Sequence, residues 1–460
     1  MPHPTFTWLH LSDLHYGLKG QHCLWPNLRG PFLEDLTALH ERCGPWDAVL
    51  FTGDLVQAGK PEEYQKMQEE VLAPLWAKLR ELGSGDAVLL AVPGNHDLCR
   101  PDPNKGDHAA ERLTEPGGYE KVRVEFWEQP AGSYRNIIQN AFAAYTEWWN
   151  STPHRPSALK GGVLPGDFAA SLEKQGKKIG LIGLNTAFLQ LAGGDYQGRL
   201  DWDTQQLHTL CDGGADVWTR QHDACLLLSH HGPDWLSAEA RRHGEIEITP
   251  AGRFAAHLFG HQHETTLCYL RQGGSAQAAR RVQDCSLFGM EKFGDPPQTQ
   301  RSHGYMAGRI AFEDHQTTLR LWPRIATNKP DGWRFIPDHN NTHLADDQGT
   351  APEIIATLPC KAPISITGTP TPTLPRDLIE FLASAYPEVR DARALWERSG
   401  GRALEVENIA RPFDLWQNLW RRSNQGAVAQ PEAILRAVRE DYPGNALIAQ
   451  YLAAYSANVK

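Results

Sequence analysis

Short runs of apolar residues recur along the first 325 residues and are the most regular feature of the sequence. Six of them have the length of a buried strand, and they span residues 7–11, 48–52, 87–92, 179–184, 224–229 and 255–259. Amphipathic stretches with helical spacing, such as residues 62–82, lie between several of these runs. Strands that alternate with helices predict an α/β domain.

Two segments depart from this alternation. Residues 98–166 contain an aromatic, helix-like stretch over residues 134–150 between flanks with the composition of loops, and we expect an insertion or cap over the sheet. After residue 259 the pattern changes to strands without intervening helices. Residues 326–372 are rich in Pro, Thr, Asp and Asn, which is typical of extended, exposed chain, so we expect a linker there.

The last part of the chain has a purely helical pattern. Between residues 376 and 455 apolar positions recur at helical spacing, as Leu378, Leu382 and Ala385 illustrate. The predicted organisation is an α/β domain over residues 1–325, a linker over 326–372 and a small all-α domain over 373–460.

Composition narrows the possible classes of function. The 460 residues are 41% hydrophobic and carry a net charge of −10, which gives no support for the broad basic surface of a tight duplex binder. Eight Cys are scattered without a CxxC pair, which indicates reduced, buried thiols and argues against zinc ribbons. The N-terminus lacks the pattern of a signal peptide, and no apolar run reaches membrane-spanning length, so we expect a cytoplasmic protein.

Five of the apolar runs end directly in residue types that bind metal ions. Strands of an α/β sheet direct their carboxyl ends to one edge, so side chains that follow them converge even when they are far apart in sequence. In an Asp-x-His or His-x-His step of extended chain, both outer side chains face the same way and can face one ion. The residues concerned are Asp13 with His15, then Asp54, then Asn95 with His96 and Asp97, then His230 with His231, and finally His261 with His263.

The chemistry of this set narrows the choice of metal. Carboxylate, amide oxygen and imidazole together suit Mn, Fe, Zn or Ni better than copper(I) or an iron–sulfur cluster. Glycines at positions 53, 94 and 260 precede three of the groups, where they permit a sharp exit from the strand and a close approach of the backbone to a ligand.

The ordered motifs Asp-x-His, Gly-Asp, Gly-Asn-His-Asp, His and Gly-His-x-His resemble the signature of calcineurin-like metallophosphoesterases, over residues 8–263. The resemblance implies a β-sandwich flanked by helices, in the layer order α-β-β-α. It also implies two divalent metal ions, for which we favour manganese, bridged by Asp54. One ion would be held by Asp13, His15, Asp54 and His263, and the other by Asp54, Asn95, His230 and His261.

The same resemblance implies roles for residues outside the metal ligands. His96 would be a catalytic residue near the leaving group of the substrate. Asp97 is expected to orient the loop of His96, and His231 is expected to pack behind the ligands because it faces the other way from its neighbour.

Two metal ions clamp the oxygens of a phosphoryl group and lower the pKa of bound water. A decayed copy that serves only as a scaffold usually loses ligands, and all seven are present here.

Local motifs favour a phosphodiester substrate. Residues 53–57 with residues 59–64, and the doublet His230-His231 after Ser229, resemble class III cyclic nucleotide phosphodiesterases. Those enzymes commonly have Pro directly after the His pair, whereas Gly232 intervenes here, and their cap is shorter than residues 98–166. Hydrolysis of nucleotides and hydrolysis of nucleic acid by a nuclease therefore both remain open.

Residues 376–455 resemble a bacterial effector-associated domain, a death-like helical bundle. Residues 434–445 carry most of this resemblance, and residues 393–409 depart from it. The resemblance implies a protein partner with a similar helical domain, in a bacterial conflict or antiphage system.

Two hypotheses for the whole protein follow. It is either an effector enzyme that this domain recruits, or a signalling adaptor whose phosphoesterase domain is chiefly a scaffold. The intact ligand set favours the enzyme.

Overall fold

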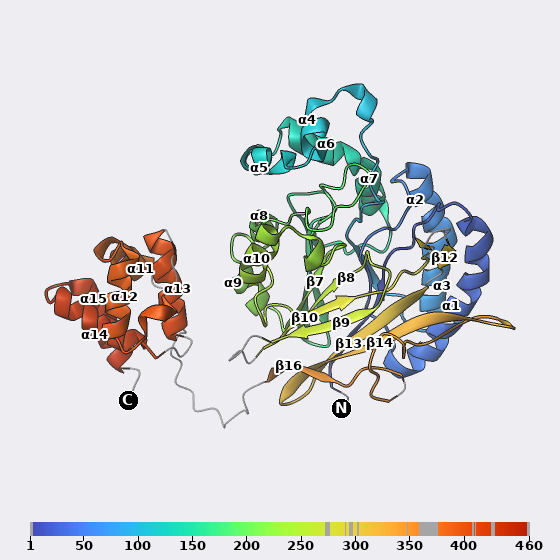
Figure 1. Cartoon of the computed structure of the whole chain (residues 1–460). Helices are drawn as coiled ribbons and strands as arrows, with labels where there is room; N and C mark the ends of the chain where they lie inside the picture. Colours follow the sequence, from blue (N-terminus) through green and yellow to red (C-terminus); the bar gives the residue numbers. More distant parts are fainter. Residues whose placement is uncertain are drawn as a thin grey trace. The chain divides into compact units, whose positions relative to one another are not determined.

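The chain divides into two compact units, Met1–Cys360 and Lys361–Lys460 (Figure 1). The computed structural model describes residues 3–271, 277–289, 291–293, 298–300, 303–346, 348–357, 376–406, 409, 411–424 and 428–457.

The first sheet of the larger unit is built around three parallel strands whose side chains are almost all buried. β1 (Thr5–Leu11) pairs with β2 (Ala48–Phe51), and β2 pairs with β3 (Val88–Ala91). Because both faces of these strands are covered, each reads in the sequence as an uninterrupted apolar run. Antiparallel strands extend this sheet on the other side of β1, namely β13 (Gly304–Phe312), β14 (Gln316–Lys329), β15 (Gly332–Pro337) and β16 (Glu353–Thr357).

The second sheet has four parallel strands at its centre, and three of them match apolar runs in the sequence. β6 (Lys177–Gly183), β7 (Ala224–Leu228) and β8 (Ala256–Phe259) lie side by side in chain order. All six strands that the apolar runs predict are therefore present. The remaining strands of this sheet are β4 (Leu159–Gly161), β5 (Phe168–Lys174), β9 (Thr266–Leu270) and β10 (Ala279–Gln283), and a separate ribbon pairs β11 (Glu291–Phe293) with β12 (Gln298–Gln300).

Helices cover the outer faces of the two sheets, as Figure 1 shows. The first sheet carries α1 (Gln21–Cys43), α2 (Pro61–Met67), the π-helical turn η1 (Gln68–Leu72) and α3 (Ala73–Glu81). The second sheet carries α8 (Thr204–Leu210), α9 (Ala215–Arg220), the short η3 (Pro233–Trp235) and α10 (Ala238–Glu247). A single hydrophobic core joins these layers. The expected α/β class and its α-β-β-α layering are confirmed.

Residues 98–166 are more helical than the sequence pattern indicates. The expected helical stretch is present as α6 (Ser133–Ala141) and α7 (Ala143–Ser151), but the preceding flank, expected to be a loop, also holds helices. These are too short for their periodicity to be visible in the sequence. Tyr119 and Arg123 donate hydrogen bonds to Asp201 over 2.7 and 2.9 Å, which ties the segment to the loop before α8. The additional helices are η2 (Pro103–Lys105), α4 (His108–Thr114) and α5 (Gly118–Glu128).

The expectation of a linker over residues 326–372 is wrong for its first part, and the sheet extends past the expected boundary at residue 325. The end of β14 pairs with β15 through the hairpin at Gly332, and the start of β14 pairs with β16. These strands lie at an open side of the sheet, where exposed positions tolerate polar residues, so their composition resembles that of a loop. Residues 358–372 lie outside the described residues.

The smaller unit is entirely helical where it is described, as expected. Its buried core includes Leu382, Trp396, Trp416, Trp420 and Val438. The helices are α11 (Arg376–Ala385), α12 (Val389–Arg398), η4 (Ala403–Glu405), α13 (Pro412–Asn424), α14 (Pro431–Asp441) and α15 (Ala446–Ala457). Among the helices described in the whole chain, none has the length and apolar character needed to cross a membrane.

Candidate metal centre

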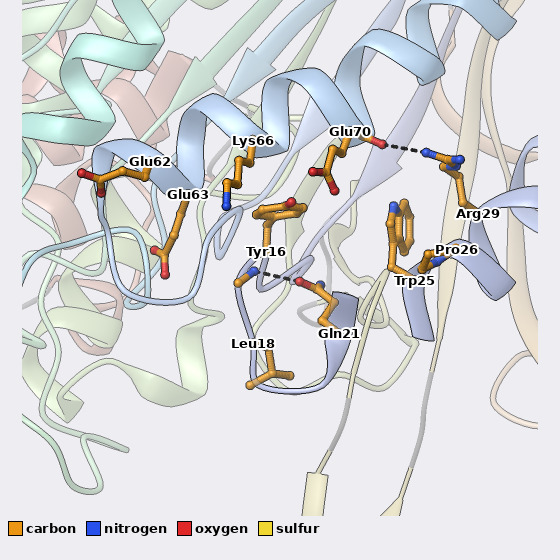
Figure 2. Close-up of a pocket in the computed structure, with 11 residues that line it drawn as sticks. Tyr16, Leu18, Gln21, Trp25, Pro26, Arg29, Glu62, Glu63, Lys66 and Glu70 are labelled. Atoms are coloured by element: carbon orange, nitrogen blue, oxygen red, sulfur yellow. Dashed lines mark hydrogen bonds between the residues drawn. The ribbon is translucent and has the colours of Figure 1, made fainter. Parts of the chain in front are cut away.

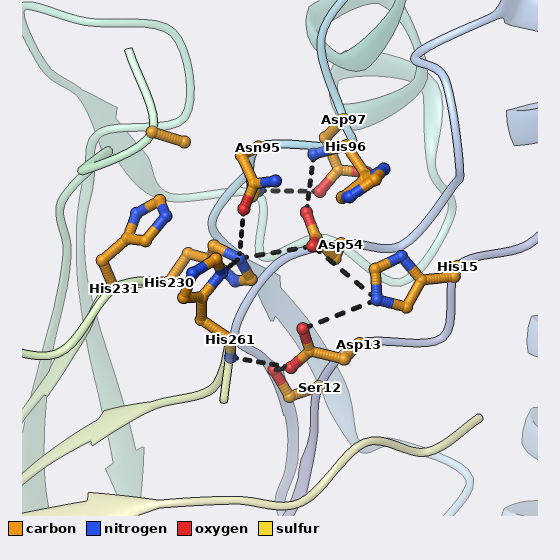
Figure 3. A network of polar contacts seen from close by, with 12 residues as sticks. Ser12, Asp13, His15, Asp54, Asn95, His96, Asp97, His230, His231 and His261 are labelled. Atoms are coloured by element: carbon orange, nitrogen blue, oxygen red, sulfur yellow. Dashed lines mark hydrogen bonds and ion pairs between the residues drawn. The ribbon is translucent and has the colours of Figure 1, made fainter. Parts of the chain in front are cut away.

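The carboxyl ends of strands from both sheets meet at one place in the larger unit (Figure 3). β1, β2 and β3 supply the loops of the first sheet, and β7 and β8 supply those of the second. A hydrogen bond across the junction, from Nδ1 of His230 to the carbonyl oxygen of Thr52 over 2.7 Å, links the two sheets. All seven residues predicted as metal ligands lie here, together with His96, Asp97 and His231.

One group of donor atoms comes from β1 and β8. Oδ1 of Asp13 lies 3.3 Å from Nε2 of His263 and 3.8 Å from Nε2 of His15. The two imidazole Nε2 atoms are 3.1 Å apart. Donor atoms that each bind one ion at about 2.0–2.2 Å stand roughly 3.0–3.6 Å from one another. This group therefore has the spacing of ligands around a common ion.

A second group comes from β3, β7 and β8. Nε2 of His230 lies 3.1 Å from Oδ1 of Asn95 and 3.2 Å from Nδ1 of His261. It also lies 3.4 Å from Oδ2 of Asp54. The same Asp54 oxygen is 3.8 Å from Nε2 of His15, so this carboxylate lies between the two groups.

Hydrogen bonds from the surrounding chain orient these donor atoms. Oδ2 of Asp13 accepts the backbone N–H of His261 over 3.0 Å and the hydroxyl of Ser12. Its other oxygen, Oδ1, is buried, receives no hydrogen bond and faces the two imidazoles. The carbonyl of Thr52 fixes the proton of His230 on Nδ1, which leaves the lone pair of Nε2 for the site. An unpaired carboxylate oxygen and oriented lone pairs fit a pair of divalent cations.

The backbone adopts an unusual conformation at the same positions. Of the described residues other than glycine, seven have positive φ, and five of these are predicted ligands: Asp13, His15, Asp54, His261 and His263. Such conformations cost about 1–3 kcal/mol each and concentrate at functional sites. The expectation that extended Asp-x-His and His-x-His steps bring their side chains together is therefore wrong. Left-handed turns at both outer residues do so instead.

Two glycines leave room for this packing. A Cβ atom at position 94 would overlap the carboxylate and the backbone nitrogen of Asp54. A Cβ atom at position 260 would overlap the side chains of Ser12 and Asp13. The loops after β3 and β8 can therefore approach the ligands only with glycine at these positions.

Burial and charge set the protonation of the donor atoms. Although burial favours their neutral forms, the histidines around Asp13 and Asp54 hold the pKa of both carboxyls below the ordinary value. Burial lowers the pKa of His15 to about 4 and that of His261 to about 3, so both rings are neutral at pH 7. Burial also opposes a charge on His230, but the Asp54 carboxylate raises its pKa to about 9. Metal binding must displace this proton.

His96 borders the centre and is half-buried. Its Nδ1 lies 2.9 Å from the main-chain carbonyl oxygen of Gln57 and 3.1 Å from the side-chain Nε2 of the same residue. One of its ring nitrogens lies within 4.8 Å of ligand atoms of His15 and Asp54. Its backbone N–H donates to Oδ1 of Asp54 over 2.7 Å.

Asp97 and His231 lie next to the donor groups, and hydrogen bonds hold both side chains in place. Asp97 accepts the backbone N–H groups of Gly94, Leu55 and Val56 over 2.8, 3.2 and 3.1 Å, which ties together the loops after β2 and β3. Both ring nitrogens of His231 are engaged, one with Gln190 and one with Thr186. The ring of His231 lies 4.4 Å from the ring of His261, and one of its nitrogens lies within 4.8 Å of ligand atoms of His230 and His261.

The sequence analysis missed Asp284, whose Oδ2 lies 3.9 Å from Nδ1 of the buried His10 behind the ligands. Asp284 directly follows β10, which pairs in parallel with β8. The pattern that found the other residues, a polar side chain directly after an apolar run, could in principle have found Asp284. It did not, because the short β10 contains two arginines and is therefore not an apolar run. No pattern in the sequence indicated that Gln57 contacts the ring of His96.

Comparisons with known proteins identify the families that the two parts of the chain match. The family model for calcineurin-like phosphoesterases matches residues 6–265, and the model for effector-associated domain 1 matches residues 371–456. A cAMP/cGMP dual specificity phosphodiesterase of Mycobacterium tuberculosis is 35% identical over 101 residues. That match spans 21% of this chain and 28% of the length of the relative.

Two solved structures that match over much of the chain share little sequence with it. A hypothetical protein from Thermus thermophilus has a TM-score of 0.32 and 16% identity, over 69% of this chain and 99% of its own. The calcineurin-like phosphoesterase YfkN from Bacillus subtilis has a TM-score of 0.29 and 12% identity, over 77% of this chain and 92% of its own. With TM-scores this low, neither adds to what the family model establishes.

Proposed function

The chain belongs to the calcineurin-like phosphoesterase family, which hydrolyses phosphoesters with pairs of divalent metal ions, and from this we propose that the protein is a phosphodiesterase acting on nucleotides or nucleic acid. Its residues 371–456 form an effector-associated domain 1. Both resemblances drawn from the sequence motifs are thereby confirmed.

The position of Asp54 carries the proposal. Its Oδ2 atom lies 3.8 Å from Nε2 of His15 in one donor group and 3.4 Å from Nε2 of His230 in the other. A shared carboxylate sets two ions at the separation of about 3.5–4 Å that two-metal hydrolases use. We assign one ion to Asp13, His15, Asp54 and His263 and the other to Asp54, Asn95, His230 and His261, and we favour manganese for both. Bound there, the ions would neutralise phosphoryl charge and acidify water.

His96 is proposed as the general acid. The main chain and side chain of Gln57 both engage Nδ1, so Nε2 is the nitrogen left to give a proton to the leaving oxygen of a substrate. Proton transfer from a positioned side chain contributes about 10²–10⁴ in rate. Asp97 and His231 take the positioning roles, because Asp97 ties the loops of Asp54 and Asn95 together and His231 packs beside His261.

A nucleotide diester is the favoured substrate. The relative from Mycobacterium tuberculosis is a cyclic nucleotide phosphodiesterase, and the chain has a net charge of −10, which does not favour a long nucleic acid. A panel assay with Mn²⁺ tests the proposal, with cyclic nucleotides, single- and double-stranded DNA, RNA and phosphomonoesters as substrates. Hydrolysis of cyclic nucleotides is expected. Cleavage of DNA or RNA alone would make the protein a nuclease.

The effector-associated domain is proposed to recruit the enzyme to a protein that carries a similar domain, in a bacterial conflict or antiphage system. The two hydrophobic cores have no residue in common, which supports a division of labour between catalysis and recruitment. The competing proposal is a signalling adaptor. It requires full metal occupancy without hydrolysis of any substrate in the panel, including an artificial diester such as bis(p-nitrophenyl) phosphate.

A further inference from the structure

Two aromatic residues outside the ligand set lie close to it, Tyr16 and Trp235. Tyr16 directly follows the ligand His15 and lines a cavity of about 360 Å³ between the start of α1 and the α2–η1 segment (Figure 2). None of the proposed metal ligands is among the lining residues, and the walls carry charges of both signs, from Glu62, Glu63, Glu70, Lys66 and Arg29. The cavity therefore indicates no particular ligand. Trp235, in η3 after β7, instead contacts a ligand directly.

The ring of the ligand His261 lies among three other aromatic rings. The indole of Trp235 is the nearest of them, with ring centroids 4.0 Å apart and the two planes at 87° to each other. The rings of His231 and His230 follow, with centroids at 4.4 and 5.0 Å (Figure 3). Aromatic pairs prefer such edge-to-face geometry. Trp235 therefore makes the closest ring contact of this ligand.

His261 lacks the hydrogen bond that usually orients a metal-binding imidazole. Such a ring ordinarily donates its second N–H to a carboxylate or a carbonyl, as His230 does to the Thr52 carbonyl. In His261, Nδ1 faces Nε2 of His230 over 3.2 Å, and Nε2 makes no hydrogen bond with any described residue. The bond from its backbone N–H to Asp13 fixes the main chain but not the side-chain torsions. Packing must therefore set the direction of Nδ1.

The main chain around Trp235 is anchored at two points. The carbonyl of Trp235 accepts the backbone N–H groups of Gly198 and Leu200 over 3.1 and 3.2 Å. At the start of the same loop, a Cβ atom at position 232 would overlap the ring of Phe259, the last residue of β8. Gly232 thus lets the loop after β7 pack directly on the end of the strand that leads into His261.

The indole acts through its ring and not through a hydrogen bond. Its N–H group is buried and has no acceptor among the described residues. The ring also packs on His231, with centroids 5.8 Å apart, and Gln190 and Thr186 hold His231 in place. The ring of His261 therefore packs against an anchored indole and an anchored imidazole.

We propose that Trp235 is a positioning residue that directs the ring of His261 toward the second metal ion, through edge-to-face packing in place of a hydrogen bond. The proposal rests on the assignment of His261 to that ion under the proposed function. Without the indole, His261 gains other side-chain conformations in which Nδ1 no longer faces the ion. The second ion is then bound less tightly, whereas the first ion, which other residues hold, keeps its affinity.

Calorimetric titration of the metal-free, full-length chain with Mn²⁺ tests the proposal. The parent should bind two ions. Trp235→Leu should weaken one of them about 10–100-fold, the usual effect of removing a residue that orients a ligand, and leave the other unchanged. Trp235→Phe keeps an aromatic ring and should restore most of the lost affinity.

Trp218→Leu is the matched control. Trp218 is also a partly buried indole on a histidine, with ring centroids 4.1 Å from those of His222, but His222 lies outside the metal centre. This variant should bind both ions like the parent. A variant with weakened metal binding at this position would show that loss of any such indole disturbs the centre, and would overturn the proposal.

Kinetics separate positioning from contact with the substrate. Trp235→Leu should regain the parent rate on bis(p-nitrophenyl) phosphate when the Mn²⁺ concentration is raised about 10–100-fold, in step with the weaker second ion. At saturating Mn²⁺ its KM for this diester should equal that of the parent. A raised KM under these conditions would identify Trp235 as a substrate contact and overturn the proposal.

Two parent-like affinities in Trp235→Leu would also overturn it, as would equal weakening of both ions, which would indicate general loosening of the fold. If Trp235→Leu does not unfold cooperatively, Trp235→Met, which keeps more of the side-chain volume, is titrated and judged by the same results. A parent chain that binds fewer than two ions would refute the metal assignment itself. A parent chain that binds two ions but hydrolyses nothing would refute the proposed hydrolysis and leave the role of Trp235 intact.

Discussion

Oδ2 of Asp54 lies 3.4 Å from Nε2 of His230, although the two residues follow strands of different sheets. The same oxygen also faces His15, so one carboxylate joins two groups of donor atoms. The two carboxylates of Asp13 and Asp54 repel each other, but the surrounding histidines outweigh this repulsion and keep the pKa of both carboxyls below the ordinary value.

Asp54→Ala should remove both ions and all measurable diester hydrolysis, because the variant lacks the atom that both donor groups share. Metal content per chain, measured by inductively coupled plasma mass spectrometry, checks this. Asp86→Ala, at an exposed position of the same unit, should keep the metal and activity of the parent. A purified Asp54→Ala chain with two ions and normal turnover would show that the ligand assignment is wrong.

His96→Ala should retain both metal ions and lose about 10²–10⁴ in the rate of the chemical step, the usual worth of general acid catalysis. The loss should be smaller for a substrate with a good leaving group, such as bis(p-nitrophenyl) phosphate, because that group needs no proton. Parallel rates on an alkyl diester and an aryl diester measure the difference. Loss of metal in His96→Ala would instead identify His96 as a ligand.

Asp97→Ala should destabilise the larger unit and weaken metal binding. It leaves the buried N–H groups of Gly94, Leu55 and Val56 without an acceptor, at about 1–3 kcal/mol for each such group. Metal affinity should fall about 10–100-fold, as it does when residues that orient ligands are removed. Thermal unfolding and metal titration measure the two effects. A variant as stable as the parent would show that the loops after β2 and β3 hold their shape without this carboxylate.

A chain that ends near residue 364 should fold and hydrolyse an artificial diester at nearly the full-length rate, because it keeps every strand of the larger unit, including β16. The isolated residues 371–460 should be helical, inactive and able to bind a partner with a similar domain. Charge reversal at the exposed Arg421 and Glu440 should weaken that binding without affecting hydrolysis. Arg422 is a poorer choice than the sequence alone indicates, because it donates to the carbonyl of Glu405. Loss of hydrolysis on truncation would contradict separable functions.

The helical unit should lose stability in acid through Asp441. Hydrogen bonds from Arg398 and Tyr386 lower the pKa of this carboxyl to about 2, from an ordinary value of 3.8. A lowered folded-state pKa stabilises the fold above pH 4, and this contribution disappears as the pH falls from 4 through 2. Asp441→Asn should therefore be less stable than the parent at pH 6, and the difference should narrow by pH 2. A difference in melting temperature that does not change with pH would contradict this assignment.

The sequence by itself determined which residues could form the centre. Each ligand group follows an apolar run that is long enough only for a strand, and parallel strands end at a common edge, so Asp13, Asp54 and Asn95 had to approach one another. The same regularity gave the α/β class and the helical C-terminal unit. The pattern of apolar runs did not predict the strands within residues 326–357, because strands with one exposed side have the composition of loops.

Only the tertiary structure decided how these residues meet. Two sheets, rather than one, supply the ligands. The hydrogen bond from His230 to the Thr52 carbonyl joins the two sheets, and the sequence around neither residue predicts it. The turns at Asp13 and His263 are left-handed because packing against neighbouring loops outweighs the local preference of the backbone.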